Sequence, residues 1–551
     1  MPKVKKETAG KFSLVAAILY IIGNVVGIGI FFKNGTVFRL NEGNYLGVLL
    51  AWIISIVIVL CMALSFAEVS TCKMKNKNAG VGGWAAQFCG HAFGRYAKTG
   101  YSLIFWPANT FAIMFFAGEA ILNCFAPMLG WDQVSGYNYG TGTTAIIFGI
   151  GAALFVVFML LNYFKANAMS KAGSIISFVK FAPILMVVVL GIVFGVMYNE
   201  SGAWAGHFVQ TETYSGEFTP MGIISAIPAI LFAFEGYISV GNISGDIENS
   251  ERNLSLAVVL GVAIISVLYL AVTIGCITAG TGNVYNLMHI LLEKGISEVA
   301  YQILTIIISI FIFICLIGCV NGMARGGISA YQSLAEEGAL FKSKALLEAK
   351  PGNKMFAGSI LFFAMVMFWW VILVIPSSIL NTDAMADGSS TSMVLCLYII
   401  YGVTVLGGFV NRFSKKVEVK KQKLFPVTAV IGILGCVFMV FFVGFVQFLA
   451  APIININNGL IYDGVATETT PLWQGLKSGW GMFVNAPNCL GIERAGGFYV
   501  LTNIEAMAWF WGMTVVMALL PIFNDLFIKW SGNKEHQQLI WQKNKKAVKF
   551  A

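Results

Sequence analysis

Three ionisable side chains, Glu119, Lys180 and Glu235, lie within long apolar runs of this sequence. A charged group inside a lipid bilayer is costly, and such residues usually belong to a pathway for a substrate, an ion or a proton. Glu235 lies in the middle of its run, so a functional role is favoured over that of a carboxylate that only bridges two helices. It can pair with a cationic ligand, carry a proton or hydrogen-bond unwound backbone, and the sequence leaves these choices open. Glu119 lies toward one end of its run, where a position at the membrane interface is the simpler interpretation.

Lys180 is the most discriminating of the three residues. It lies in the apolar stretch Ile175–Ile184, and a lysine at the centre of a membrane helix costs roughly 2.5–3.5 kcal/mol on insertion scales. One alternative is a side chain that extends to the membrane interface and keeps its ammonium group in water. The other is a functional lysine that releases and recaptures a proton, because burial disfavours the charged form. We favour the second and assign Lys180 a role in coupling.

Glycines interrupt the first apolar run, Ile21–Phe32, at Gly23, Gly27 and Gly29. Because it has no Cβ, glycine lets the backbone leave the helix and approach a ligand closely. Unwound backbone at membrane depth is tolerated only where protein buries it or where it lines a polar cavity. Small residues at this spacing also suit close packing of helices, which is the alternative.

A second interruption lies in the run Ala226–Ser239, which holds Pro228 near its start and Glu235-Gly236 in its middle. Interruptions in corresponding spans of two halves are the best sequence pointer to a substrate site in a membrane carrier. The two runs therefore predict two broken helices that face one another.

Composition identifies an integral membrane protein. Hydrophobic residues make up 58% of the 551 positions, charged residues make up 11%, and mean hydropathy is +0.79. Soluble domains have roughly 45–50% apolar and 25% charged residues. Apolar runs of about 20 residues predict twelve spans, near residues 12–33, 44–66, 97–125, 142–161, 172–197, 220–244, 254–279, 300–325, 355–377, 392–411, 425–449 and 499–527.

The distribution of basic residues predicts the orientation. With a cytoplasmic N-terminus, 29 of the 35 Lys and Arg residues fall in cytoplasmic segments, as the positive-inside rule requires. Both termini are therefore expected in the cytoplasm and the protein in the cytoplasmic membrane. The net charge of +9 then faces lipid headgroups and not a nucleic acid. The first run is interpreted as a retained helix, since no small-residue cleavage site follows it.

Several classes of protein are disfavoured. The ten cysteines form no Cys-x-x-Cys pair, and none of the four histidines lies in a predicted span, so no metal or cofactor is expected. The sequence has no Gly-x-x-x-x-Gly-Lys-Ser/Thr run for a nucleotide. A channel needs a filter or a ring of charges, and neither is present. We therefore expect neither an enzyme nor an ATP-driven pump.

The stretch Gly23–Phe31 resembles the first-helix signature of the amino acid–polyamine–organocation superfamily of permeases. Two positions depart from the family pattern, since Ser250 stands where a proline is usual and Ser329 where an arginine is usual. The joint order of the matching stretches over roughly residues 12–450 is specific, although each stretch alone is weak. The further matches are Ala63–Glu68, Gly82-Gly83, Ala92–Gly94, Phe232–Gly236, Asp246–Arg252, Asn321-Gly322 and Leu334–Gly338.

The resemblance implies an all-α integral membrane fold of twelve transmembrane helices. Two inverted five-helix repeats of the leucine-transporter type are then followed by two additional helices. The number of subunits is left open. The implied segments are a cytoplasmic tail 1–11, a first repeat 12–197, an extracellular loop 198–219, a second repeat 220–411, additional helices 412–529 with a long extracellular loop near 450–498, and a basic cytoplasmic tail 530–551.

The resemblance also implies that an amino acid binds between the two broken helices. Free N–H groups of Gly27–Gly29, at the start of a half-helix, suit an α-carboxylate. The α-ammonium needs acceptors, which unwound carbonyls supply. Phe232 resembles the aromatic residue that closes over the substrate in relatives, with a core aromatic as the alternative. The residues assigned to this site are Val25, Gly27, Ile28, Gly29, Phe232, Ala233, Phe234, Glu235 and Gly236.

In sodium-independent members of the family, a lysine of the fifth helix resembles Lys180 and places its ammonium where related transporters bind sodium. We therefore expect a secondary amino acid permease that works by alternating access, is coupled to protons and does not need sodium. The alternatives are an amino acid exchanger and a polyamine or organic-cation carrier on the same scaffold. The expected partners are an amino acid, protons and the lipid bilayer.

Overall fold

The computed structural model describes residues 12–27, 29–41, 43–73, 80–125, 142–197, 218–279, 282, 297–380, 384–450, 492–494, 498–500 and 503–531. Ile28, the predicted tail 1–11 and most of the predicted segments 198–219, 450–498 and 530–551 lie outside the described residues.

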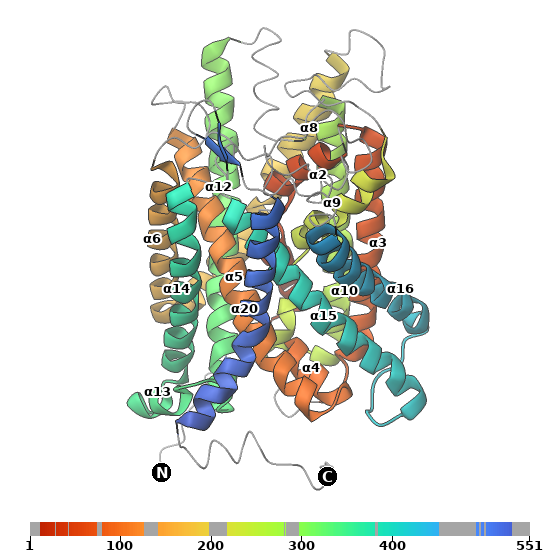
Figure 1. Cartoon of the computed structure of the whole chain (residues 1–551), viewed down its shortest axis with the longest axis vertical. Coiled ribbons are helices and arrows are strands. Elements are labelled where there is room, and N and C mark those ends of the chain that lie inside the picture. Colours follow the sequence, from red (N-terminus) through yellow and green to blue (C-terminus); the bar gives the residue numbers. More distant parts are fainter. Residues whose placement is uncertain are drawn as a thin grey trace.

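The helices form a bundle, with α4 and α13 at the same end (Figure 1). In chain order the elements are α1 (Leu14–Val25), the π-helix η1 (Gly29–Lys33), α2 (Asn34–Leu40), α3 (Tyr45–Val69), α4 (Gly80–Phe88), α5 (His91–Phe125), α6 (Thr143–Phe164), α7 (Ala166–Val179), α8 (Phe181–Met197), α9 (Pro220–Ala233), the 3-10 helix η4 (Tyr237–Asp246), α10 (Ser250–Ala279), α12 (Glu298–Glu336), α13 (Ser343–Ala349), α14 (Lys354–Leu380), α15 (Ala384–Ser414), α16 (Phe425–Phe438), the π-helix η5 (Met439–Ala450), the antiparallel strands β1 (Ile492–Arg494) and β2 (Phe498–Val500), and α20 (Asn503–Trp530).

Among the residues that the structure describes, eleven helices are long and apolar enough to cross a membrane. They correspond to the second through the twelfth of the predicted spans. The first predicted span contains a shorter apolar helix, Leu14–Val25, followed by η1 and α2. The multi-pass, predominantly helical fold is therefore confirmed, and the count of twelve stays a prediction.

Local sequence signals explain where several helices begin. Ser13, Asn44 and Thr219 precede α1, α3 and α9, and each side-chain oxygen accepts a hydrogen bond from the backbone N–H three residues later, at 3.3, 2.9 and 3.2 Å. Such caps satisfy an amide group that has no partner within the helix. Pro220 occupies the first position of α9, where its missing N–H costs nothing.

Small residues let α5 and α6 cross closely. A Cβ on Gly118 of α5 would come within 2.3 Å of the Ile147 carbonyl oxygen, and a Cβ on Gly151 of α6 within 2.5 Å of the Met114 carbonyl oxygen. Backbones approach this closely only where a side chain is absent, as in many membrane helix pairs. Because α5 also packs against α4, α12 and α15, it forms a central column of the bundle.

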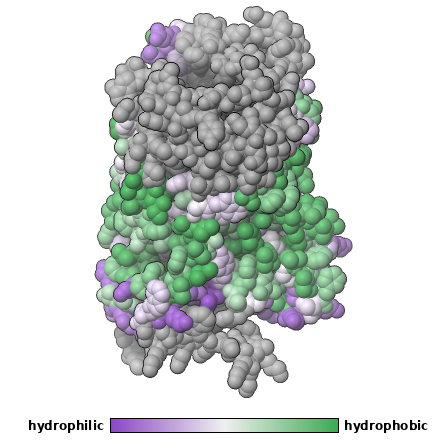
Figure 2. All heavy atoms as spheres, viewed as in Figure 1, coloured by the Kyte–Doolittle hydropathy of each residue, from purple (hydrophilic) through white to green (hydrophobic). Residues whose placement is uncertain are grey.

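The outer surface is apolar over the middle of the bundle. Leu160, Val267 and Phe413 are 52, 69 and 76% exposed. On the visible face, hydrophobic residues form a band, with hydrophilic residues toward the end where α13 lies (Figure 2). An apolar band of this extent is unfavourable in water, so it suits a surface that faces lipid.

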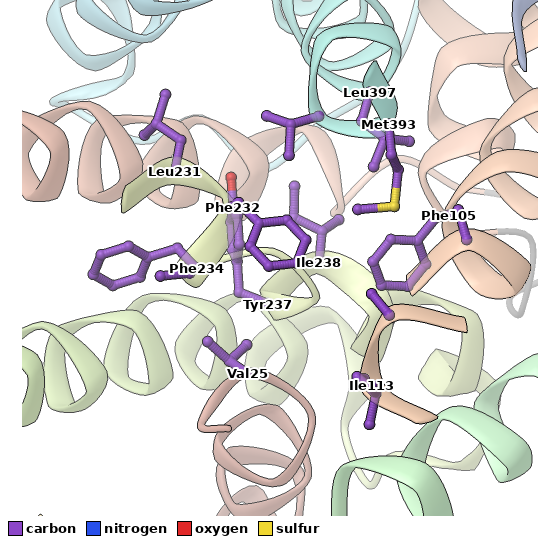
Figure 3. Close-up of a cluster of buried hydrophobic side chains, with 14 of the residues drawn as sticks. Val25, Phe105, Ile113, Leu231, Phe232, Phe234, Tyr237, Ile238, Met393 and Leu397 are labelled. Carbon is purple, nitrogen blue, oxygen red and sulfur yellow. The ribbon is translucent and has the colours of Figure 1, made fainter. Parts of the chain in front are cut away.

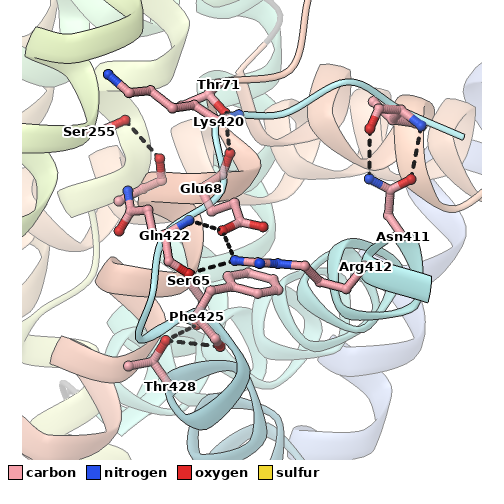
Figure 4. Close-up of polar contacts among 12 residues, drawn as sticks. Ser65, Glu68, Thr71, Ser255, Asn411, Arg412, Lys420, Gln422, Phe425 and Thr428 are labelled. Atoms are coloured by element: carbon pink, nitrogen blue, oxygen red, sulfur yellow. Dashed lines mark hydrogen bonds and ion pairs between the residues drawn. The ribbon is translucent and has the colours of Figure 1, made fainter. Parts of the chain in front are cut away.

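A buried ion pair joins α3 to α15 (Figure 4). Arg412 pairs with Glu68, whose side chain is 2% exposed. The guanidinium of Arg412 also donates to the Gln422 carbonyl at 2.6 Å, and the Gln422 N–H donates to Oε2 of Glu68 at 2.6 Å. The last residue of the motif Ala63–Glu68 therefore anchors the connection between α15 and α16.

Candidate functional site

The first predicted interruption is present in the structure. α1 ends at Val25, and Val26 after it has an extended backbone, with φ −72° and ψ 111°. Helical structure resumes at Gly29 as η1 and continues as α2. Because the last carbonyls of a helix have no partner within it, the end of α1 offers hydrogen-bond acceptors to other groups.

The second predicted interruption is also present. α9 ends at Ala233, with Phe234 as its cap, and the chain continues as the 3-10 helix η4. Between them Gly236 has φ +103°, a left-handed conformation that glycine adopts without steric cost. Glu235 therefore lies between two helical segments.

Backbone hydrogen bonds join the start of α1 to the end of η4. The N–H of Phe12 donates to the Asp246 carbonyl at 2.7 Å, and the N–H of Glu248 donates to the Phe12 carbonyl at 2.9 Å. These bonds make a single parallel bridge between Phe12 and Ile247. Arg325 of α12 lies over the bridge, with its guanidinium carbon 5.3 Å from the centroid of the Phe12 ring.

The two breaks contact each other. A Cβ on Gly29 would come within 2.4 Å of the Cα of Ala233, so η1 lies directly against the end of α9. Tyr269 of α10 bridges the breaks, since its hydroxyl lies 3.0 Å from the Val25 carbonyl and 3.1 Å from the Ala233 carbonyl. Carbonyls of two residues assigned to the predicted site, one in each break, thus share one phenolic donor. The sequence did not identify Tyr269, because nothing distinguishes it from a core aromatic of its span.

The other glycines of the first run serve close packing. A Cβ on Gly23 would come within 2.4 Å of the Ser177 Oγ, and a Cβ on Gly27 within 2.7 Å of the Cys319 Sγ. From the sequence, close packing of helices was the alternative to a break in the helix. The structure has both, because α7 and α12 press against the backbone at the place where α1 ends.

Lys180 points into the break of α1. Its side chain is fully buried, and its ammonium lies 2.7 Å from the Gly23 carbonyl, 2.7 Å from the Val26 carbonyl and 2.9 Å from the Cys319 Sγ. Three donors thus meet three acceptors, two of which are carbonyls at the end of α1. A lysine that extends to the membrane interface, the alternative from sequence, is wrong.

A pocket opens between α1, α7 and α12, next to Lys180. Its lining includes Gly23 and Gly318; Gly23 accepts a hydrogen bond from Lys180, and a Cβ on Gly318 would lie 2.8 Å from the Lys180 Cε. The pocket therefore reaches the residues that surround the ammonium group. Its polar lining consists of Tyr20, Asn24, Ser174, Ser177, Asn321 and Arg325.

Apolar side chains from several helices gather beside the two breaks (Figure 3). Phe232 and Phe234 point in different directions, and Phe234 packs against Trp52 and Tyr269 with ring centroids 6.4 and 5.2 Å apart. The ring of Phe232 lies among the residues that Figure 3 draws from α1, α5, η4 and α15. That group includes Val25, Phe105, Ile113, Ile238, Met393 and Leu397.

Two charged residues lie deeper than the sequence suggested. Lys33 falls in an outer segment of the predicted topology, yet it is 2% exposed, and its ammonium lies 5.0 Å from the centroid of the Phe232 ring and 3.4 Å from the Ser390 Oγ. Glu119 is also 2% exposed, so the structure places it inside the protein and not at a solvated interface. Sequence hydropathy did not reveal this burial, because it cannot show which side chains the bundle covers.

The break in α9 holds the third ionisable residue. Glu235 is 4% exposed, and its Oε2 accepts a hydrogen bond of 3.1 Å from the hydroxyl of Tyr401 in α15. Among the described residues, no group of His, Cys, Asp and Glu is arranged to hold a metal ion. The bundle therefore brings two broken helices, a buried lysine and a buried carboxyl to its centre.

Comparison with known proteins identifies the family to which this membrane protein belongs. Residues 12–467 match the family model described as amino acid permease. The chain belongs to this family. The permease is 24% identical to the serine/threonine exchanger SteT of Bacillus subtilis over 436 residues, which cover 78% of this chain and 89% of that relative. It is 24% identical to the mouse b(0,+)-type amino acid transporter 1 over 408 residues, covering 73% of this chain and 76% of that relative.

A further relative matches only part of the permease. The glutamate/serine transporter AimA of Bacillus subtilis is 25% identical over 268 residues, covering 46% of each protein. The family and the named relatives are transporters of amino acids and not enzymes. They support amino acid transport as the role of the permease, and they agree with the resemblance of the sequence motifs.

Proposed function

We propose that the permease is a secondary transporter that moves amino acids across the cytoplasmic membrane by alternating access, with both termini in the cytoplasm. The observation that carries the proposal is the contact between the two helix breaks inside the bundle. Peptide groups at a break lack partners within the helix, and a zwitterion supplies a carboxylate for N–H groups and an ammonium for carbonyls. The proposed contacts are Val25 and Gly27–Gly29 in the first break and Phe232–Gly236 in the second.

Coupling to protons, without sodium, is supported by the position of Lys180. Carriers of this architecture bind sodium with carbonyls of unwound backbone and helix C-termini, and here the ammonium of Lys180 already contacts the Gly23 and Val26 carbonyls. A neutral amine has fewer donors than an ammonium, so loss of the proton would weaken the hold on α1. The adjacent pocket, whose lining includes Ser177 and Asn321, is the proposed route for that proton.

The fold that belongs to this proposal has twelve transmembrane helices. Residues 12–197 and 220–411 form two inverted five-helix repeats, and residues 412–529 add two helices. The breaks in α1 and α9 support this arrangement, because they lie in the first helix of each proposed repeat.

An amino acid exchanger is the second candidate, favoured by the name of the relative SteT. Net uptake requires that the empty transporter can turn its binding site back to the outside, whereas an exchanger makes that step only with a substrate bound. A polyamine or organic-cation carrier on the same scaffold is the third.

Uptake of labelled serine by the purified permease in liposomes tests these candidates. We expect competition by unlabelled amino acids, no loss when choline replaces sodium, and stimulation when the outside is acidic. Uptake that requires an amino acid inside the liposome would identify an exchanger. Competition by polyamines alone would overturn the amino acid assignment, and strict dependence on sodium would overturn the coupling.

A further inference from the structure

The carboxyl group of Glu235 is surrounded by four buried tyrosines, which we call the tyrosine cage: Tyr101 of α5, Tyr237 of η4, and Tyr398 and Tyr401 of α15. Each of the four is 1% exposed or less, and the hydroxyl of Tyr401 is hydrogen-bonded to the carboxyl. Tyr401 is central, with its ring centroid 5.6 Å from that of Tyr398 and 6.3 Å from that of Tyr101.

The cage leaves hydrogen-bonding capacity unused. Tyr401 donates to Oε2 of Glu235 at 3.1 Å. Oε1 of Glu235 and the hydroxyls of Tyr237 and Tyr398 have no hydrogen-bond partner among the described residues. Buried polar groups are normally paired, so a cluster of unpaired oxygens around one carboxyl indicates a site that binds something small.

No cation balances Glu235 within the described part of the chain, where the structure gives it no ion pair. Among the described residues, the titratable groups near it are the four tyrosines and Cys436 of α16, all of which are ordinarily neutral at pH 7. An ionised carboxylate buried without a cation costs several kcal/mol. A protonated carboxyl avoids that cost and adds one O–H donor, for which the unpaired tyrosine oxygens are acceptors.

We propose that the Glu235 carboxyl and the tyrosine cage form a second proton-binding site of the permease, separate from Lys180. The inference rests on the proposed function and chooses among the roles that the sequence left open for Glu235. The carboxyl takes up one proton on one side of the membrane and releases it on the other. When Glu235 is ionised, the phenolic hydroxyls donate to it; when it is protonated, one phenolic oxygen accepts from it.

The position of the cage explains how this proton affects transport. Glu235 lies in the break of α9, whereas Tyr398 and Tyr401 belong to α15, so the occupancy of the site changes the contact between these helices. Each broken helix then has its own ionisable partner: Lys180 serves the break of α1, and Glu235 serves that of α9.

The test compares the full-length permease with Glu235→Gln in liposomes. Glutamine is neutral and keeps a donor and an acceptor, so it imitates the protonated state. We expect Glu235→Gln to lose stimulation of uptake by an imposed pH gradient. Its exchange of labelled for unlabelled amino acid, which needs no net proton movement, should lose the pH dependence that the wild-type protein shows. The matched control is Glu298→Gln, an exposed carboxylate in the first turn of α12, which should keep that stimulation.

Tyr401→Phe provides a second variant should Glu235→Gln fail to fold. It removes the donor to Oε2 and keeps the carboxyl, so the pH profile of gradient-driven uptake should shift to more alkaline pH. Infrared pH-difference spectra of the wild-type protein should also show a carboxyl band that Glu235→Gln removes.

Other outcomes separate this inference from the proposed function. Full pH-gradient stimulation in Glu235→Gln would overturn the inference and leave amino acid transport intact, whereas a wild-type protein that takes up no amino acid would overturn the proposed function. Loss of competition by cationic amino acids alone would overturn the inference and make the Glu235 carboxyl a partner for the side chain of a cationic substrate. If the wild-type protein responds to sodium or potassium instead of pH, and Glu235→Gln loses that response, the cage is a metal-cation site and the inference is overturned.

Discussion

The backbone of Ala233 lies so close to Gly29 that a Cβ on Gly29 would come within 2.4 Å of the Ala233 Cα. This contact joins two segments that lie far apart in the sequence, and it is possible only because one partner has no side chain. The two breaks are therefore held at a fixed separation by backbone, with Tyr269 as a side-chain bridge.

We expect Gly29→Ala to abolish transport. The added methyl group must displace the end of α9, and overpacking of this kind typically costs about 1–3 kcal/mol. Uptake and thermal unfolding of the purified variant measure both effects. Gly149→Ala is the control, because a Cβ at that exposed position of α6 meets nothing within 4 Å, and it should be neutral or slightly stabilising. Normal uptake by Gly29→Ala would show that the breaks are free to separate.

Tyr269→Phe should slow transport and lower stability. The variant keeps the ring and removes the donor that serves the Val25 and Ala233 carbonyls, and an unpaired buried acceptor costs about 1–3 kcal/mol. Thermal unfolding and initial rates of uptake provide the measurement. Tyr163→Phe removes a hydroxyl that bonds only Asn353 in an exposed contact and should change neither. Equal effects of the two variants would contradict the bridging role of Tyr269.

Lys180→Met should impair exchange as well as gradient-driven uptake of amino acid. Methionine keeps the length of the side chain, but the Gly23 and Val26 carbonyls lose their charged donor. The measurement is exchange and uptake across a range of pH. Lys171→Met, at an exposed position of α7, is the control. Normal transport with an unchanged pH profile in Lys180→Met would rule out its role in coupling.

Arg412→Ala should destabilise the permease by about 3 kcal/mol, because it leaves the buried Glu68 without its cation. Chemical unfolding in detergent measures the loss. Lys73→Ala breaks the exposed pair with Glu418 and should have no measurable effect, since exposed ion pairs contribute little. A double variant, Glu68→Gln with Arg412→Met, should lose less stability than Arg412→Ala; an equal or larger loss would argue against an uncompensated charge as the cause.

The sequence predicted the helix breaks because glycine and mid-span acids are local signals. Lys180 was equally visible, since a lysine within an apolar run demands a partner. The partners themselves were not predictable: Lys180 meets Gly23 across 157 residues, and Tyr401 meets Glu235 across 166 residues. Tyr269 and the tyrosine cage look like ordinary core aromatics until the bundle brings their hydroxyls to the breaks. Burial of Lys33 and Glu119 likewise depends on neighbours that hydropathy does not identify.

The backbone bridge at Phe12 ties the first half of one broken helix to the last part of the other. If the bridge persists during the cycle, α1 and η4 must swing together as a single lever. The two breaks then act as their common hinges. A single tilt that opens one end of the substrate path moves both α1 and η4. A cross-link between these segments would then be tolerated during turnover, whereas one from α1 to α12 would stall the protein.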